Sequence, residues 1–333
     1  MNRTDDTEGK SELNIVAIGG GNGLSMLLSG LKAFVRSGTS PGIADLSAIV
    51  AVSDDGGSSG RLRKELGMLS PGDIRNCMVA LSEDSHLLSK LFRHRFGGSG
   101  ELAGHSFGNI FLAALTEITG DFAEAVKLSS EILASKGHIY PATMADVRLA
   151  AELHDGSVVR GETTVGKFGS SIRRVFLDPE SCPPLPDAIR AIGRADVVTI
   201  GPGSLYTSIL PPLLVQGVPE AIASSGAVKI FVCNLMTQPG ETDGLNSLQH
   251  LETLCRHTPP IKFDYILVND RPITPEQQKK YASEGSEQIG VRGTLASAGI
   301  ESVMIIYDNL LDDSEKVRHD PEKLARLVLR CGQ

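Results

Sequence analysis

Residues 15–24 read IVAIGGGNGL and mark the start of an α/β fold. A short apolar run stops at four glycines in five residues, and apolar residues then recur at three- and four-residue spacing from Leu24 to Val35. The order strand, glycine loop and amphipathic helix brings backbone N–H groups and the positive end of a helix dipole toward an anion. We therefore expect a phosphate-bearing ligand near Gly19–Leu24.

This glycine loop departs from the common phosphate-binding fingerprints. Leu24 stands where the dinucleotide motif has Gly or Ala, and no Lys-Ser or Lys-Thr pair follows, so the loop is no P-loop. A tight turn without a ligand is the alternative interpretation, because glycine turns are permissive.

The composition is that of a globular protein and excludes some functions. The chain has 333 residues, of which 41% are hydrophobic and 22% charged, and a formal net charge of −8. General nucleic-acid binding needs a basic face, so this charge argues against it. A local basic pocket for one nucleotide stays compatible with the composition.

The cysteines and the N-terminus indicate the compartment. Five cysteines form no C-x-x-C pair, which favours a reducing cytoplasm without disulfides or a zinc site. Residues 1–12 are polar, so we expect a disordered tail and no signal peptide. No run approaches the ~20 apolar residues of a membrane span.

Alternating strand and helix patterns run along most of the chain. Strands are predicted at 15–18, 46–52, 197–200, 230–233, 265–268 and 302–306. Helices are predicted at 24–35, 72–81, 87–92, 109–118, 121–134, 247–255 and from residue 320 onward. This order predicts a Rossmann-like, doubly wound, mostly parallel sheet with helices on both faces. Residues 144–178, around an Asp-Gly hairpin turn, predict a small antiparallel insertion.

Several predicted strands end in residues suited to ligand binding. In such sheets ligands lie outside the carboxyl ends of the strands. Asp54 and Asp55 could hold ribose hydroxyls or a magnesium ion, unless 54–60 is only a solvated loop. The segment 201–204 is either a backbone nest for an anion or a helix cap. Asn234 follows a further strand.

Three other segments carry candidate contacts. His105 and Asn109 are interpreted as polar ligand contacts or helix caps in preference to part of a catalytic dyad. In the loop-to-helix entry 71–76, Arg75 could pair with phosphate. Tyr281 could stack on a base and Arg318 could pair with a diphosphate, the alternative being two surface residues.

Seven ordered segments together resemble one known family. They are residues 19–24, 52–63, 71–77, 105–109, 201–208, 234–242 and 318–321. Over about residues 13–330, as a single domain, the chain resembles the gluconeogenesis-factor (YvcK-type) branch of the CofD-like superfamily. Asn22 is a departure, because this family usually shows Thr there.

The resemblance implies a cytoplasmic Rossmann-like protein that binds UDP-N-acetylglucosamine, with NAD(P) as another ligand. It implies a role that links gluconeogenic growth to peptidoglycan precursor supply and cell shape, with no required cofactor and magnesium as an optional ion. A regulatory protein partner and a homodimer are compatible with it, whereas nucleic acid and membrane are not expected. The sister branch implies the alternative, a magnesium-dependent transferase that moves a phospholactyl-type group from a guanosine diphospho-conjugate to a deazaflavin.

Carried onto this chain, the resemblance implies two sets of contacts. Tyr281 and Arg318 would contact the nucleotide sugar, and Asp54 or Asp55 would form the acidic site. The expected nucleotide and phosphate contacts are Gly19, Gly20, Gly21, Asn22, Gly23, Leu24, Asp54, Asp55, Gly56, Asp73, Asn76, His105, Asn109, Gly201, Gly203, Ser204 and Asn234. An NAD-dependent oxidoreductase is a third hypothesis, disfavoured by Leu24 and by the lack of an evident proton donor.

Overall fold

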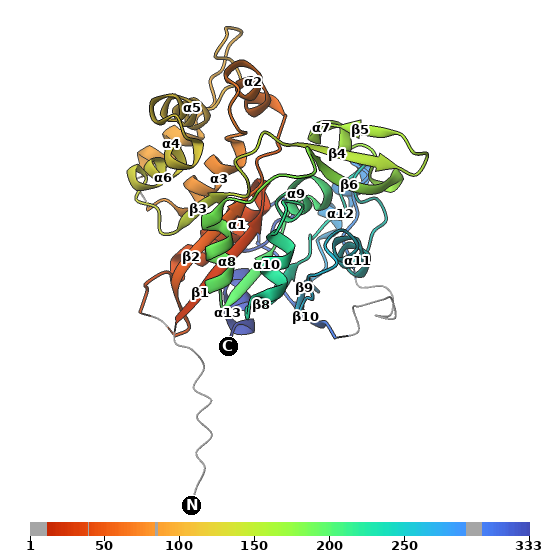
Figure 1. The fold of residues 1–333 in the computed structure, drawn as a ribbon. Helices are drawn as coiled ribbons and strands as arrows, with labels where there is room; N and C mark the ends of the chain where they lie inside the picture. Colours follow the sequence, from red (N-terminus) through yellow and green to blue (C-terminus); the bar gives the residue numbers. More distant parts are fainter. Residues whose placement is uncertain (1–11, 39, 84–85, 291–301) are drawn as a thin grey trace, which may run out of the picture.

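The main sheet is parallel, as the strand and helix patterns predict. The computed structural model describes residues 12–38, 40–83, 86–290 and 302–333 (Figure 1). Within this part a seven-stranded sheet has the order β10-β9-β8-β7-β1-β2-β3, and every adjacent pair is parallel. Its strands are β1 (Glu12–Gly19), β2 (Gly42–Val50), β3 (His138–Pro141), β7 (Val197–Ile200), β8 (Val228–Val232), β9 (Tyr265–Asn269) and β10 (Met304–Asp308).

Strand β1 lies in the middle of this sheet, between β2 and β7. Its apolar residues are buried on both faces, which explains the uninterrupted apolar run at the start of the sequence. The chain fills the sheet on the β2 side first and on the β7 side afterwards. The strand order therefore reverses between β1 and β7, which is the switch point where doubly wound sheets bind ligands.

Helices cover both faces of the sheet (Figure 1). Helices α8 and α10 pack together in front of it in this view, whereas α1 packs against α3 and α13. The helices of the first half are α1 (Gly21–Leu31), η1 (Lys32–Phe34), α2 (Gly57–Leu66), α3 (Gly72–Leu81), α4 (His86–Arg93), α5 (Phe107–Thr119), α6 (Phe122–Ile132), α7 (Glu162–Val165) and η2 (Gly169–Ser171). The later ones are α8 (Pro186–Arg194), η3 (Leu205–Ile209), α9 (Leu210–Leu213), α10 (Val218–Ser224), α11 (Ser247–His257), α12 (Pro275–Ser283) and α13 (Pro321–Cys331).

The predicted antiparallel insertion forms a separate three-stranded sheet in the order β5-β4-β6. Its strands are β4 (Arg148–Leu153), β5 (Val158–Arg160) and β6 (Ile172–Asp178). The buried guanidinium of Arg63 donates hydrogen bonds to the Asp146 carboxylate and to the Ser53 and Val147 carbonyls. This contact fastens the insertion to the loop after β2.

Some predicted boundaries were wrong. Glu12 begins β1 instead of ending a tail, and residues 1–11 of that predicted tail lie outside the described residues. Helix α2 was not predicted, because its sequence GSSGRLRKEL is polar and has little apolar periodicity. Strand β3 was missed because four residues are too short for a periodic signal. No helix in the described part of the chain is long and apolar enough to cross a bilayer.

Candidate functional site

Two glycine-rich loops meet at the switch point. The first, residues 19–23, leads from β1 into α1, and the second, residues 201–204, follows β7. Because β1 and β7 are paired, the loops leave the same edge of the sheet. A Cβ on Gly23 would overlap the backbone of Pro202, so the loops approach each other at a distance that only glycine allows.

A cavity of about 380 Å³ lies between these loops, and we call it the loop cavity. It brings together eight of the residues that the sequence predicted as contacts: Gly20, Gly21, Asn22, Gly23, Gly203, Ser204, Asn234 and Arg318. Four segments far apart in the sequence supply its walls, including 234–238 after β8 and 317–319 before α13. The edge of the sheet therefore carries one composite site.

The N-terminus of α1 supplies hydrogen-bond donors to this cavity. The first N–H groups of a helix have no partner within the helix. The Gly21 N–H faces the carboxylate of Asp73, whereas in the described residues no acceptor outside the helix lies on the N–H groups of Asn22 and Gly23. These two N–H groups, at the positive end of the helix dipole, suit a phosphate oxygen.

In the second loop and at the start of η3, backbone groups already have hydrogen-bond partners within the protein. Asn234 accepts a hydrogen bond from the Gly203 N–H at 3.0 Å and donates to the Gly203 carbonyl at 2.6 Å. The Glu241 carboxylate accepts from the N–H groups of Tyr206 and Thr207 at the start of η3. A side-chain carboxylate thus occupies the place that an anionic ligand would take, so residues 201–204 shape the wall and the first loop provides the donors.

A second hollow of about 550 Å³ runs between α1 and α3, and we call it the helix groove. Helix α1 lines it with Asn22, Ser25, Met26 and Ser29, and α3 lines it with Asn76, Val79 and Ala80. Arg93 and Arg318 complete its wall. Asn22, Gly23, Arg318 and His319 line both hollows, so the two are neighbours.

The segment before α13 supplies two residues that line both hollows, the cation Arg318 and the neutral imidazole of His319. The Arg318 side chain is exposed and has no hydrogen bond or ion pair within the described residues. His319 is 7% exposed, and burial lowers its pKa to about 4, so the ring is neutral at pH 7. Its Nε2 atom is buried without a hydrogen-bond partner. The hydroxyl of Tyr281 accepts a hydrogen bond from the Val317 N–H at 3.1 Å. Tyr281 therefore contacts the residue next to Arg318 in the chain and lines neither hollow.

The carboxylates of Asp54, Asp73 and Glu162 lie near one another beside the first glycine loop. Burial raises the pKa of Asp73 to about 6, and the nearby charge of Asp54 adds to this increase. Burial also raises the pKa of Glu162, and Asp54 and Asp73 push it in the same direction. Glu162 belongs to the antiparallel insertion, and no sequence motif singled it out.

The carboxylates of Asp54 and Asp55 have different hydrogen-bond partners. The Asp54 carboxylate accepts from the Gly56 N–H at 2.8 Å, whereas Asp55 accepts from the N–H and hydroxyl of Thr163 at 3.2 and 3.1 Å. Asp55 is thus bound to α7 in the insertion, whereas Asp54 is bound to the loop before α2. No group of three or more potential metal ligands is present among the described residues. A magnesium ion near Asp54 therefore stays a prediction.

His105 and Asn109 join α2 to α5. His105 Nδ1 lies 3.0 Å from the Ser58 hydroxyl, which also accepts from Asn109 Nδ2 at 3.1 Å. Ser106 caps α5 by accepting from the Asn109 N–H. Both predicted side chains are buried and line neither hollow. Neither side chain caps a helix in this structure, and a direct ligand contact of His105 or Asn109 stays a prediction.

Four further predicted residues line neither hollow: Gly19, Leu24, Gly56 and Gly201. Gly19 ends β1, Gly201 follows β7, and Gly56 precedes α2. The side chain of Leu24 is fully buried in the core. Of the site residues that sequence reasoning missed, Glu241 lay in the quoted segment 234–242 and His319 in the segment 318–321. Arg93 had no such signal.

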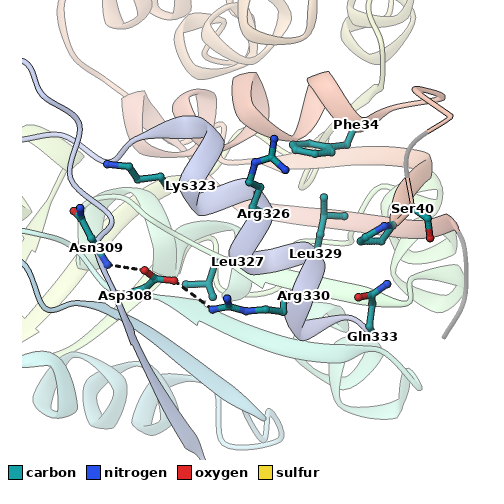
Figure 2. Close-up of a pocket in the computed structure, with 11 residues that line it drawn as sticks. Phe34, Ser40, Asp308, Asn309, Lys323, Arg326, Leu327, Leu329, Arg330 and Gln333 are labelled. Atoms are coloured by element: carbon teal, nitrogen blue, oxygen red, sulfur yellow. Dashed lines mark hydrogen bonds and ion pairs between the residues drawn. The ribbon is translucent and has the colours of Figure 1, made fainter. Parts of the chain in front are cut away.

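A separate cavity of about 570 Å³ lies along α13 (Figure 2). Arg326 stacks over the ring of Phe34 and pairs with Glu322, and Arg330 pairs with Asp308. Lys323 donates to the Leu311 carbonyl. Its cations are already partnered, and it contains none of the predicted residues, so the switch point is the stronger candidate.

Comparisons with known proteins show the family and the fold of the chain. A family model described as 2-phospho-L-lactate transferase CofD matches residues 15–311. The chain is 45% identical to a gluconeogenesis factor of Halalkalibacterium halodurans, over 95% of each chain. It is 46% identical to a gluconeogenesis factor of Bacillus subtilis, over 95% of this chain and 96% of that one. A crystal structure of a UPF0052 family member from Bacillus halodurans has a TM-score of 0.88 and 45% identity, covering 96% of this chain and 100% of that chain. The chain therefore belongs to the gluconeogenesis-factor family and carries its CofD-like domain.

Proposed function

We propose that this protein is a cytoplasmic regulator that binds a nucleotide diphosphate in the loop cavity and does not turn it over. UDP-N-acetylglucosamine is the preferred ligand in this proposal, and NAD(P) is the other one. Through a partner protein, the bound state would link gluconeogenic carbon metabolism to peptidoglycan precursor supply and cell shape. No cofactor is required, and magnesium is an optional ion; a homodimer is compatible with this role.

One observation carries the proposal: the unpaired Arg318 side chain lines the same cavity as the N–H groups of Asn22 and Gly23. A guanidinium group and helix N-terminal N–H groups are the donors that bind diphosphates. The name gluconeogenesis factor of the relatives supports the regulatory part.

Calorimetric titration with UDP-N-acetylglucosamine tests this function. Arg318→Ala should weaken binding about tenfold or more, because a charge-assisted contact to phosphate is lost. Arg326→Ala is the matched control, since Arg326 is an exposed arginine of α13 that pairs with Glu322 outside the cavity. Absence of binding by the wild type, or equal affinity in both variants, would refute the proposal.

A magnesium-dependent transferase of the CofD kind is the second candidate. The family match and the closeness of Asp54, Asp73 and Glu162 favour it. Asp54 would help to hold a magnesium ion that neutralises diphosphate charge. The protein, a guanosine diphospho-conjugate, a deazaflavin and magnesium should then release GMP, and Asp54→Asn should abolish the release. No GMP above a protein-free blank excludes this candidate.

A further inference from the structure

The helix groove contains two arginines that nothing in the described chain neutralises. Arg93 comes from the last turn of α4, and Arg318 comes from the segment before α13. Neither has a hydrogen bond or an ion pair among the described residues, in a chain whose net charge is −8. By contrast, Arg326 and Arg330 in the cavity along α13 are both paired with carboxylates.

Positive charge is concentrated on the α3–α4 side of this groove. The guanidinium groups of Arg95 and Arg93 are close enough to Arg75 to lower its pKa, in addition to the larger effect of burial. The Nε atom of Arg75 is buried without a hydrogen-bond partner. The carboxylates of Asp73 and Asp54 shift the pKa of Arg75 in the opposite direction. Like charges that gather beside a hollow favour an anion in it.

The other lining residues complete this chemistry. The side chain of Asn22 has no hydrogen bond among the described residues, and that of Asn76 accepts from Arg75 at 2.6 Å and keeps its amide hydrogens for a ligand. No Asp or Glu of the described chain lines the groove. Met26, Val79 and Ala80 give it an apolar wall. The lining therefore suits a small polar group, such as a sugar, that carries a negative charge.

We propose that the helix groove is a second anionic subsite, in which Arg93 pairs with a carboxylate or phosphate ester carried by the ligand beyond its diphosphate. This inference rests on the proposed function, because the diphosphate would lie at the boundary that both hollows share, near Asn22 and Arg318. The anion has two chemical sources, an acidic sugar of a nucleotide sugar or a phosphate ester on the ribose of a dinucleotide.

Two matched ligand pairs test the subsite. UDP-glucuronate and UDP-glucose differ by one carboxylate, and NADP and NAD differ by one phosphate ester. In calorimetry the wild type should bind the charged member of one pair about fivefold more tightly or better, and the pair that shows this preference identifies the source. The preference should decrease at high ionic strength.

Variants assign this preference to Arg93. Arg93→Gln should reduce it to less than twofold without changing the affinity for the neutral member. Lys90→Gln removes a positive charge from the same helix outside the groove and should retain the preference. Thermal unfolding should confirm that both variants are folded.

Two kinds of result would refute the subsite, and they differ in whether the proposed function stands. If both pairs bind but neither shows a preference for charge, or if the preference persists in Arg93→Gln, the subsite is refuted while the proposed function stands. If none of the four nucleotides binds, and UDP-N-acetylglucosamine does not bind either, the proposed function is refuted and the subsite with it.

Discussion

The carboxylate of Asp73 lies against Gly20, so that a Cβ on Gly20 would be 2.5 Å from the Oδ2 oxygen. The same carboxylate faces the Gly21 N–H at the start of α1. Glycine at position 20 therefore allows the half-buried carboxylate of Asp73 on α3 to reach the N-terminus of α1. This contact fixes the loop whose next N–H groups face the loop cavity.

Gly20→Ala should destabilise the protein by about 1–3 kcal/mol, because the new methyl group would displace the Asp73 carboxylate from the Gly21 N–H. The double variant Gly20→Ala with Asp73→Ala should recover much of this loss. Gly193→Ala is the control, because a Cβ there meets nothing within 4 Å, and it should stabilise helix α8 by about 0.5–1 kcal/mol. Urea unfolding measures all three, and an unchanged stability of Gly20→Ala would contradict the contact.

Asp73→Asn should stabilise the protein at pH 8. Because the pKa of Asp73 is raised in the folded state, its charged carboxylate destabilises the folded protein above pH 6. This loss of folding free energy disappears as the pH falls from 6 to 3.8. The shift from 3.8 to about 6 corresponds to about 3 kcal/mol. The difference between variant and wild type should therefore shrink toward zero by pH 4. Denaturant titrations at pH 8, 6 and 4.5 would disprove this if the difference grew on acidification.

His319 should produce the opposite dependence on pH. Its folded-state pKa is lowered from 6.5 to about 4, mainly by burial, so the unfolded chain takes up a proton first as the pH falls. The wild type should lose up to about 3 kcal/mol relative to His319→Gln between pH 6.5 and 4. Stability curves of the two proteins that stay parallel over this range would show that the imidazole is not buried in its neutral form.

Tyr281→Phe should weaken nucleotide binding severalfold. Tyr281 acts as a positioning residue here, because its hydroxyl holds the Val317 N–H at 3.1 Å beside Arg318. Removing one such hydrogen bond costs about 1 kcal/mol. In Tyr281→Phe, a further Arg318→Ala substitution should have a smaller effect than in the wild type. Tyr307→Phe is the control, since Tyr307 is exposed and lines neither hollow; equal losses in both phenylalanine variants would contradict the assignment.

Local patterns were sufficient for six of the seven strands of the main sheet and for the two loops at its edge. The apolar run before Gly19 and the apolar periodicity after Leu24 depend only on neighbours in the chain, and they predicted β1 and α1 with boundaries up to four residues off. The dependence on neighbours in the chain also explains why helix α2 was not predicted. The sequence GSSGRLRKEL of α2 has no strong apolar face, so its helix depends on contacts with α5 that the local pattern does not contain.

By itself the sequence determined a parallel α/β sheet, the antiparallel insertion, the glycine loops and the family. Only the tertiary structure decided which side chains face the ligand. Asp55 lies next to Asp54 in sequence but binds Thr163, 108 residues away, while Arg93 of α4 and Arg318 of the segment before α13 line one groove. Periodicity reports whether a residue faces the core or the solvent, whereas the partner of a polar side chain depends on how the helices and loops pack together.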